Sequence, residues 1–141
     1  MGANSPFFPD SVLSETQGIQ YLGSVVNAQR LGLYANVTGS PALTAAQMVG
    51  GAVAVGGGAA ATATTDTAAL IVARIKAVKP GAVAGATSHF HLLNDNTGIL
   101  TLAPGAGVTI SGDGANLIPP GSSRRYLITM VSDTAVTLSP M

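Results

Sequence analysis

The sequence predicts a mainly β protein with one helix, and three observations lead to this fold class. Short apolar runs return roughly every ten residues in the second half of the chain, with turn residues between them. The segment 67–78 stands apart because its apolar side chains recur at helical spacing. Ala, Val and Thr dominate the remaining apolar runs, and short runs of this kind are typical of a β-sandwich or barrel.

Eight segments are strand candidates. They are residues 52–55, 61–65, 88–93, 99–102, 108–110, 117–118, 124–131 and 134–138. Clusters of Gly, Pro, Asn, Asp and Ser separate most of these segments and predict turns. Apolar residues fall on both sides of the segment 99–102, which indicates burial on both faces and favours an oligomer.

The helix is expected from about Thr67 to Val78. Asp66 is a suitable N-cap, since its carboxylate can accept a free backbone N–H. Lys76 and Lys79 lie near the expected carboxyl end, where a cation suits the helix dipole. Residues 80–81, Pro-Gly, then end the helix.

The aromatic residues are unevenly distributed. Four of them lie in the first 34 residues, namely Phe7, Phe8, Tyr21 and Tyr34, while Phe90 and Tyr126 follow much later. A folded domain normally places its aromatic rings in its own core. We therefore expect residues 1–40 to form an extended N-terminal arm whose rings anchor on a partner, and residues 41–141 to form the β-sandwich body. The alternative is that these rings fold back onto the body.

Composition limits the classes of partner. Only 9% of the residues are charged, and six basic residues balance six acidic ones. A surface with little charge favours association, so we expect an assembly rather than a free monomer. Nucleic acid is not an expected partner, because phosphate binding needs clustered Lys and Arg. The uncharged stretch 31–65 is too rich in Gly and polar residues for a membrane span.

Residues able to carry chemistry are few. Without cysteine there is no thiolate nucleophile, and the sequence holds no recognisable catalytic or cofactor motif, so we expect neither an enzyme nor a cofactor. His89 and His91 would share one face of a strand, and a metal site would need Asp95, Asp113 or a second subunit as third ligand. The favoured interpretation is that they merely flank an inward Phe90, and no metal site is expected.

Arg124 and Arg125 form the only adjacent basic pair. In a strand they would face opposite sides. They are candidates for a subunit interface, where one could pair with an acid of a neighbour. Equally, they could be solvated charges that discourage pairing between strand edges.

Four features follow one another in the second half of the chain: the helix from Thr67, the turn 94–98, the Gly-Ala-Gly-Val-Thr run 105–109 and the Pro-Pro-Gly-Ser-Ser run 119–123. This order of turns and strands resembles that of small virion-surface proteins of tailed bacteriophages. The resemblance covers residues 42–141 and implies a capsid decoration, or cement, protein with a jelly-roll-like β-sandwich. It further implies a homotrimer on the virion, bound to the major capsid protein at the capsid surface. A receptor- or glycan-binding module of a head fibre or tail spike is the alternative.

Overall fold

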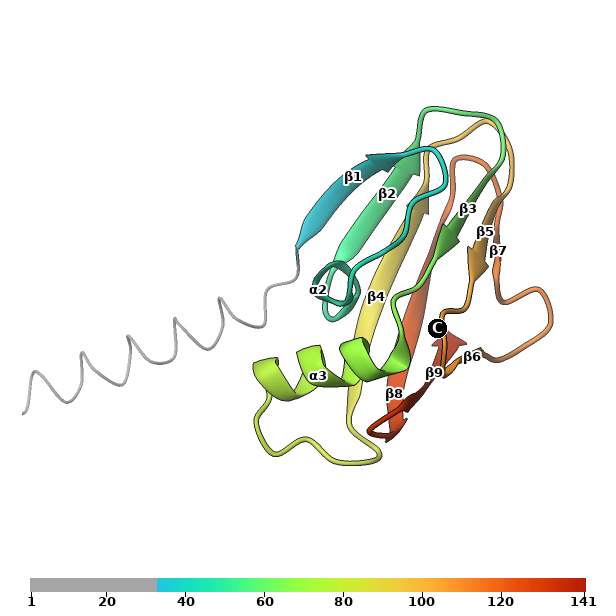
Figure 1. The fold of residues 1–141 in the computed structure, drawn as a ribbon. Helices are drawn as coiled ribbons and strands as arrows, with labels where there is room; N and C mark the ends of the chain where they lie inside the picture. Colours follow the sequence, from blue (N-terminus) through green and yellow to red (C-terminus); the bar gives the residue numbers. More distant parts are fainter. Residues whose placement is uncertain (1–32) are drawn as a thin grey trace, which may run out of the picture. The chain divides into compact units, whose positions relative to one another are not determined.

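Residues 33–141 are described by a computed structural model, in which nine strands and two helices form a mainly β body (Figure 1). In chain order, the elements are β1 (Tyr34–Thr38), α2 (Ala45–Met48), β2 (Ala52–Gly56), β3 (Ala61–Thr64), α3 (Ala68–Val78), β4 (Thr87–Asn94), β5 (Leu100–Ala103), β6 (Val108–Ile110), β7 (Leu117–Ile118), β8 (Ser123–Ser132) and β9 (Ala135–Pro140). The predicted β-sandwich with a short helix is confirmed.

The strands form two mixed sheets. The larger has the order β1-β2-β4-β8-β9-β6, and the smaller has the order β3-β5-β7. The pairs β1–β2, β2–β4, β3–β5 and β6–β9 are parallel, whereas β4–β8, β8–β9 and β5–β7 are antiparallel. The spacing of turns did not predict this mixture, because hydrophobic periodicity carries no information about strand direction.

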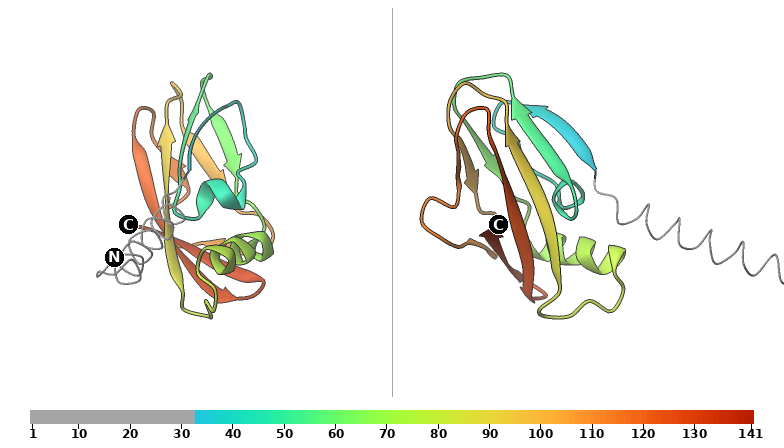
Figure 2. Two further views of the ribbon diagram at one scale, coloured as in Figure 1. Left: turned by 90° about the vertical axis from the view of Figure 1, so that its left-hand side faces the viewer. Right: turned by 180° about the vertical axis from the view of Figure 1, so that it is seen from behind.

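One layer is the six-stranded sheet, and the other consists of the small sheet with the two helices (Figures 1 and 2). The core lies between them. Phe90 and Tyr126 are directly opposite each other in β4 and β8, are both fully buried, and stack with their ring centroids 6.0 Å apart. Leu100 and Leu102 of β5 are also fully buried, while Ile99 beside them is 49% exposed. This strand therefore alternates, and burial on both faces is not observed within the described body.

The first strand corrects the predicted boundary of the body. Residues 34–38 were placed in the arm, but they form β1 and pair in parallel with β2, from Tyr34 opposite Ala52 to Thr38 opposite Gly56. Ala35 and Val37 pack against the core, and the residues that alternate with them, Tyr34, Asn36 and Thr38, are exposed. This alternation of small apolar and polar side chains forms a half-buried edge strand. The rest of the predicted arm, residues 1–32, lies outside the described residues.

The helix α3 corrects the predicted N-cap. Thr67, not Asp66, caps the helix, because the Thr67 hydroxyl accepts the N–H of Leu70 at 3.4 Å. The Asp66 carboxylate lies one residue too early and instead accepts from the N–H groups of Thr67 and Ala45, each at 2.9 Å. Since Ala45 is the first residue of α2, Asp66 ties the start of that helix to the start of α3.

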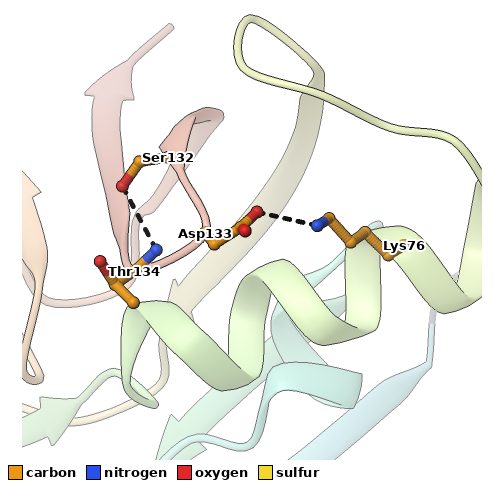
Figure 3. Close-up of polar contacts among 4 residues, drawn as sticks. All are labelled: Lys76, Ser132, Asp133 and Thr134. Carbon is orange, nitrogen blue, oxygen red and sulfur yellow. Dashed lines mark hydrogen bonds and ion pairs between the residues drawn. The ribbon is translucent and has the colours of Figure 1, made fainter.

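A surface ion pair joins α3 to the turn between β8 and β9 (Figure 3). The Lys76 ammonium donates to the Asp133 carboxylate at 2.8 Å, and in the same turn the Ser132 hydroxyl accepts the N–H of Thr134 at 3.3 Å. The side chains of Lys76 and Asp133 are 43% and 76% exposed, so water screens the pair and its contribution to stability is at most about 1 kcal/mol.

Candidate functional site

The six-stranded sheet has one covered face and one open face. The small sheet and both helices pack on its inner face, and none of residues 33–141 forms a second layer over the opposite one, which we call the outer face (Figure 2). Side chains alternate between the two along every strand. In β4, for example, Phe90 and Leu92 are fully buried, whereas His89 is exposed and His91 is half-buried.

A row of four residues crosses the outer face. Tyr34 of β1 lies opposite Ala52 of β2, Ala52 lies opposite His91 of β4, and His91 lies opposite Arg125 of β8. Paired residues in neighbouring strands point to the same face of a sheet. The row therefore places an aromatic ring, an imidazole and a guanidinium on one surface.

An open pocket of about 360 Å³ lies along this row, and we call it the outer-face pocket. Its lining consists of Leu33, Tyr34, Gly50, Gly51, Ala52, His89, His91 and Arg125. The small residues at the start of β2 lie between larger side chains from β1 on one side and from β4 and β8 on the other. The pocket thus exists because this part of β2 carries almost no side-chain volume.

Two backbone requirements keep the start of β2 small. A Cβ on Gly51 would lie 2.0 Å from the Gln47 carbonyl oxygen, so no other residue fits there without moving the backbone. Gly50 has a φ of 72°, in the left-handed region that favours glycine. The N–H of Gly50 donates to the His89 carbonyl at 2.9 Å, and the N–H of His91 donates to the Gly51 carbonyl at 3.0 Å. The pocket is therefore held by the sheet itself.

Arg125 gives the pocket a positive charge. His89 and His91 add imidazole nitrogens that can donate or accept hydrogen bonds. Within the described part of the chain, residues 33–141, no Asp or Glu contributes to the lining and the single ion pair joins Lys76 to Asp133. The His91 Nε2 atom lies 3.2 Å from the Ser123 hydroxyl, which fixes that ring against β8.

The predicted anchor residues fall into two groups. Tyr34 is 65% exposed and lies in the row on the outer face, within the described body. Phe7, Phe8 and Tyr21 lie outside the described residues. The anchor role of all four remains a prediction, and only Tyr34 is now placed on a surface.

The adjacent arginines face opposite sides of β8, as expected. Arg125 lies opposite His91 and lines the outer-face pocket. Arg124 lies opposite the buried Leu92, is half-buried, and donates from Nη1 to the Gly114 carbonyl at 3.3 Å. Their role at a subunit interface remains a prediction, but only Arg125 is directed toward an open surface.

The two histidines flank the buried Phe90 and share one face, as the favoured interpretation required. The alternative is a metal site completed by Asp95, Asp113 or a second subunit. Within residues 33–141, no group of three or more His, Cys, Asp or Glu side chains is placed to hold a metal ion. Neither aspartate joins the pair.

Tyr126 is the one described group with a clearly altered pKa. Burial raises the pKa of its phenol to about 12, and the nearby positive charge of Arg124 partly opposes this rise. The hydroxyl donates to the Ala115 carbonyl at 2.5 Å. A phenol that is neutral, fully buried and already hydrogen-bonded stabilises the core rather than transferring protons.

The outer-face pocket was not predicted from the sequence. Its only local signal is the Gly50-Gly51 pair directly before an Ala-Val-Ala-Val strand, and a glycine pair at that position indicates a turn far more often than a pocket. The pocket needs four strands brought together, two of them by parallel pairing across long connections.

Comparison with known protein families, curated proteins and solved structures finds no match to this chain. A membrane-spanning candidate is also not found, since neither helix among residues 33–141 has the length and apolar character to cross a bilayer.

Proposed function

We propose that this protein is a virion structural protein, a capsid cement or decoration protein that binds the major capsid protein on the outer capsid surface as a homotrimer. The observation that carries the proposal is the open outer face of the six-stranded sheet, with Tyr34 65% exposed beside a pocket. Aromatic side chains beside pockets are frequent energetic centres of protein interfaces. The resemblance of the turn order to virion-surface proteins, together with the low charge, adds to this support.

The mechanism is mass action. A protein that binds only the assembled lattice stabilises the lattice by an amount that grows with its free concentration relative to its Kd. No catalytic group is needed for this effect, and a rigid β body with a preformed surface meets the requirement. The free edge of β1, which no other strand among residues 33–141 pairs, offers a further backbone contact to an extended segment of a capsid subunit.

A second surface supports self-association into the trimer. The outward side of the small sheet carries Ile99 and Leu117, which are 49% and 41% exposed, next to Thr62 and Thr101. These side chains carry no charge. An exposed apolar patch of this kind on a small β body is typical of a subunit contact.

Cosedimentation tests the proposal. The full chain should pellet with assembled capsids of the phage that encodes it, should stay in solution with unassembled capsid subunits, and should raise the melting temperature of the capsids. Tyr34→Ala should weaken lattice binding, whereas Val131→Ala, which alters an exposed residue far along β8, should not. No binding to capsids, or equal binding to free subunits, would contradict a cement function.

The alternative function is a receptor- or glycan-binding module of a head fibre or tail spike. The exposed Tyr34 ring beside the imidazoles of His89 and His91 favours this candidate, since sugars bind to aromatic faces bordered by hydrogen-bonding groups. A glycan array separates the two functions. Strong hits that vanish in Tyr34→Ala, together with no capsid binding, would favour the receptor-binding module.

A further inference from the structure

We propose that the outer-face pocket binds the carboxylate of an Asp or Glu side chain that a partner protein presents within an extended segment with apolar neighbours. That this partner is a capsid protein rests on the proposed function. The preference of the pocket for a carboxylate next to apolar groups does not, because it follows from the residues that line the pocket.

The charge of the pocket selects an anion. Arg125 supplies a planar guanidinium, which forms paired hydrogen bonds with a carboxylate, and His89 and His91 can add two further donors. Among residues 33–141, no acidic side chain lines the pocket and Arg125 has no ion-pair partner. A cation next to a hollow without an acid is complementary to a negative group supplied from outside.

The apolar part of the lining determines which groups of the ligand lie next to its carboxylate. Leu33 and Tyr34 are 52% and 65% exposed and lie at the β1 side of the pocket, across the small residues from Arg125. A ligand that fills the pocket therefore meets apolar surface on one side and positive charge on the other. A carboxylate alone would leave the apolar side exposed to water, which costs part of the available affinity.

The shape and position favour a polypeptide as the source of the carboxylate. The pocket is open rather than enclosed, and its volume of about 360 Å³ suits one or two side chains. It also adjoins β1, whose free edge can accept an extended chain by backbone hydrogen bonding. An extended segment lying along β1 would bring its side chains over the row that starts at Tyr34.

The pocket is also preformed, which reduces the entropic cost of binding. The strands β4 and β8 that carry His91 and Arg125 lie inside the sheet, each paired on both sides. Ser123 holds the His91 ring at 3.2 Å, and Gly51 cannot acquire a side chain without moving the backbone. The strand backbone and the His91 ring thus need little rearrangement when a ligand arrives.

Titration of the full ¹⁵N-labelled chain with a blocked pentapeptide, Ala-Leu-Glu-Leu-Ala, tests the proposal by NMR. The peptide should shift the amide signals of Ala52, His91 and Arg125, and raising the salt concentration should weaken binding. The same peptide with Gln in place of Glu, and acetate alone, should each bind at least roughly tenfold more weakly, since each lacks one half of the recognised chemistry. Equal affinities for the Glu and Gln peptides, or no shift at these residues, would overturn it.

Neighbouring arginines provide the matched variants. Arg125→Gln should weaken the Glu peptide at least roughly tenfold, while Arg124→Gln, on the inner face, should stay within about twofold of the parent chain. An equal loss in both variants would show a general effect of charge and contradict a site. Capsid binding by Arg125→Gln is then measured separately. Peptide binding without any capsid binding by the parent chain would refute the cement function and leave the carboxylate site standing.

The assignment to a partner protein would be wrong if the chain's own acidic residues or a second copy of the chain filled the pocket. The chain's own Asp10 or Glu15 would be the occupant if the combined variant Asp10→Asn and Glu15→Gln bound the peptide more tightly than the parent chain. A second copy would be the occupant if the pocket signals moved with protein concentration before any peptide was added. Unchanged affinity in the first case and unchanged signals in the second support an external partner.

Discussion

The two faces of the six-stranded sheet carry the same residue types in different chemical settings. Tyr126 and Asn94 project inward and are buried, whereas Tyr34 and Asn36 project outward from β1 and are exposed. On β8, Arg124 lies on the inner face, whereas Arg125 lines the outer-face pocket. Each pair places the same residue type on the inner and the outer face, so a difference between its two members reflects their position and not their chemistry.

The comparison shows that the inner face is committed to stability and that the outer face is available for binding. Each inward member of these pairs has a hydrogen-bond partner: Tyr126 donates to the Ala115 carbonyl, Arg124 to that of Gly114, and Asn94 to that of Ile118. For the outward members Tyr34 and Asn36, the structure gives no side-chain hydrogen bond within residues 33–141. A buried polar group without a partner is costly, whereas an exposed one has water and remains free for a ligand.

Replacing the paired tyrosines by alanine should show the largest difference between the faces. Tyr126→Ala removes a fully buried ring stacked on Phe90 and should lower the free energy of unfolding by about 3–5 kcal/mol. Tyr34→Ala removes an exposed ring and should cost less than about 1 kcal/mol. Urea unfolding followed by far-UV circular dichroism measures both values. Similar losses in the two variants would mean that the outer face contributes to the core.

Alkaline pH should destabilise the fold through the inner tyrosine. The pKa of Tyr126 rises from its ordinary 10.0 to about 12 in the folded protein, chiefly through burial. Because the folded state holds the proton more tightly, this stabilisation is complete below pH 10 and is lost as pH rises toward 12. The loss amounts to about 2–3 kcal/mol.

Unfolding measured from pH 9 to pH 12 checks this effect. Tyr126→Phe, which loses the hydroxyl but keeps the ring, should remove most of the alkaline decrease, and Tyr34→Phe should leave it as in the parent chain. A decrease of the same size in Tyr126→Phe would assign the effect to other groups.

The sequence predicted the inner face well and the outer face poorly. Alternation around Phe90, the helix 67–78 and the turn 94–98 are local patterns, and each was found close to its expected place. The aromatic-rich start of the chain led to a boundary at residue 40, although the alternation of Ala35 and Val37 already fitted a strand. The aromatic content of the first 34 residues indicated an arm, and it outweighed the short alternating pattern around Ala35 and Val37.

Contacts between distant segments explain the remaining differences. The Asp66 carboxylate accepts the N–H of Ala45, which lies 21 positions earlier. This long-range hydrogen bond, and not the suitability of Asp as an N-cap, determines the role of Asp66. The outer-face pocket needs Tyr34, Ala52, His91 and Arg125 in one row, and no local pattern relates these four positions. Such a site can be found only after the strand order is known.

The paired asparagines should differ by about 2 kcal/mol. Asn94 is 1% exposed, donates to the carbonyls of Gly98 and Ile118, and accepts from the N–H of Asn96, each at 2.9 Å. Asn94→Ala removes these three hydrogen bonds, and a buried backbone group that is left without a partner costs about 1–3 kcal/mol. Asn36→Ala on the outer face should change the free energy of unfolding by less than about 0.5 kcal/mol. Thermal unfolding with Tm and enthalpy measured by calorimetry compares them, and equal Tm values would refute the bridging role of Asn94.

The paired arginines should show the smallest effects on stability and opposite effects on binding. Arg124→Gln loses the contact with the Gly114 carbonyl and should cost about 0.5–1 kcal/mol, whereas Arg125→Gln should stay within about 0.5 kcal/mol of the parent chain. Without the Arg124 charge, the pKa of Tyr126 should rise further, so the alkaline loss of stability should still begin near pH 10 but should extend to higher pH and become larger. Binding of the Glu peptide should follow the reverse order and be weakened only in Arg125→Gln. If one variant lost both stability and peptide binding, the two faces of β8 would be coupled. A substitution on one face would then affect the property that we assign to the other.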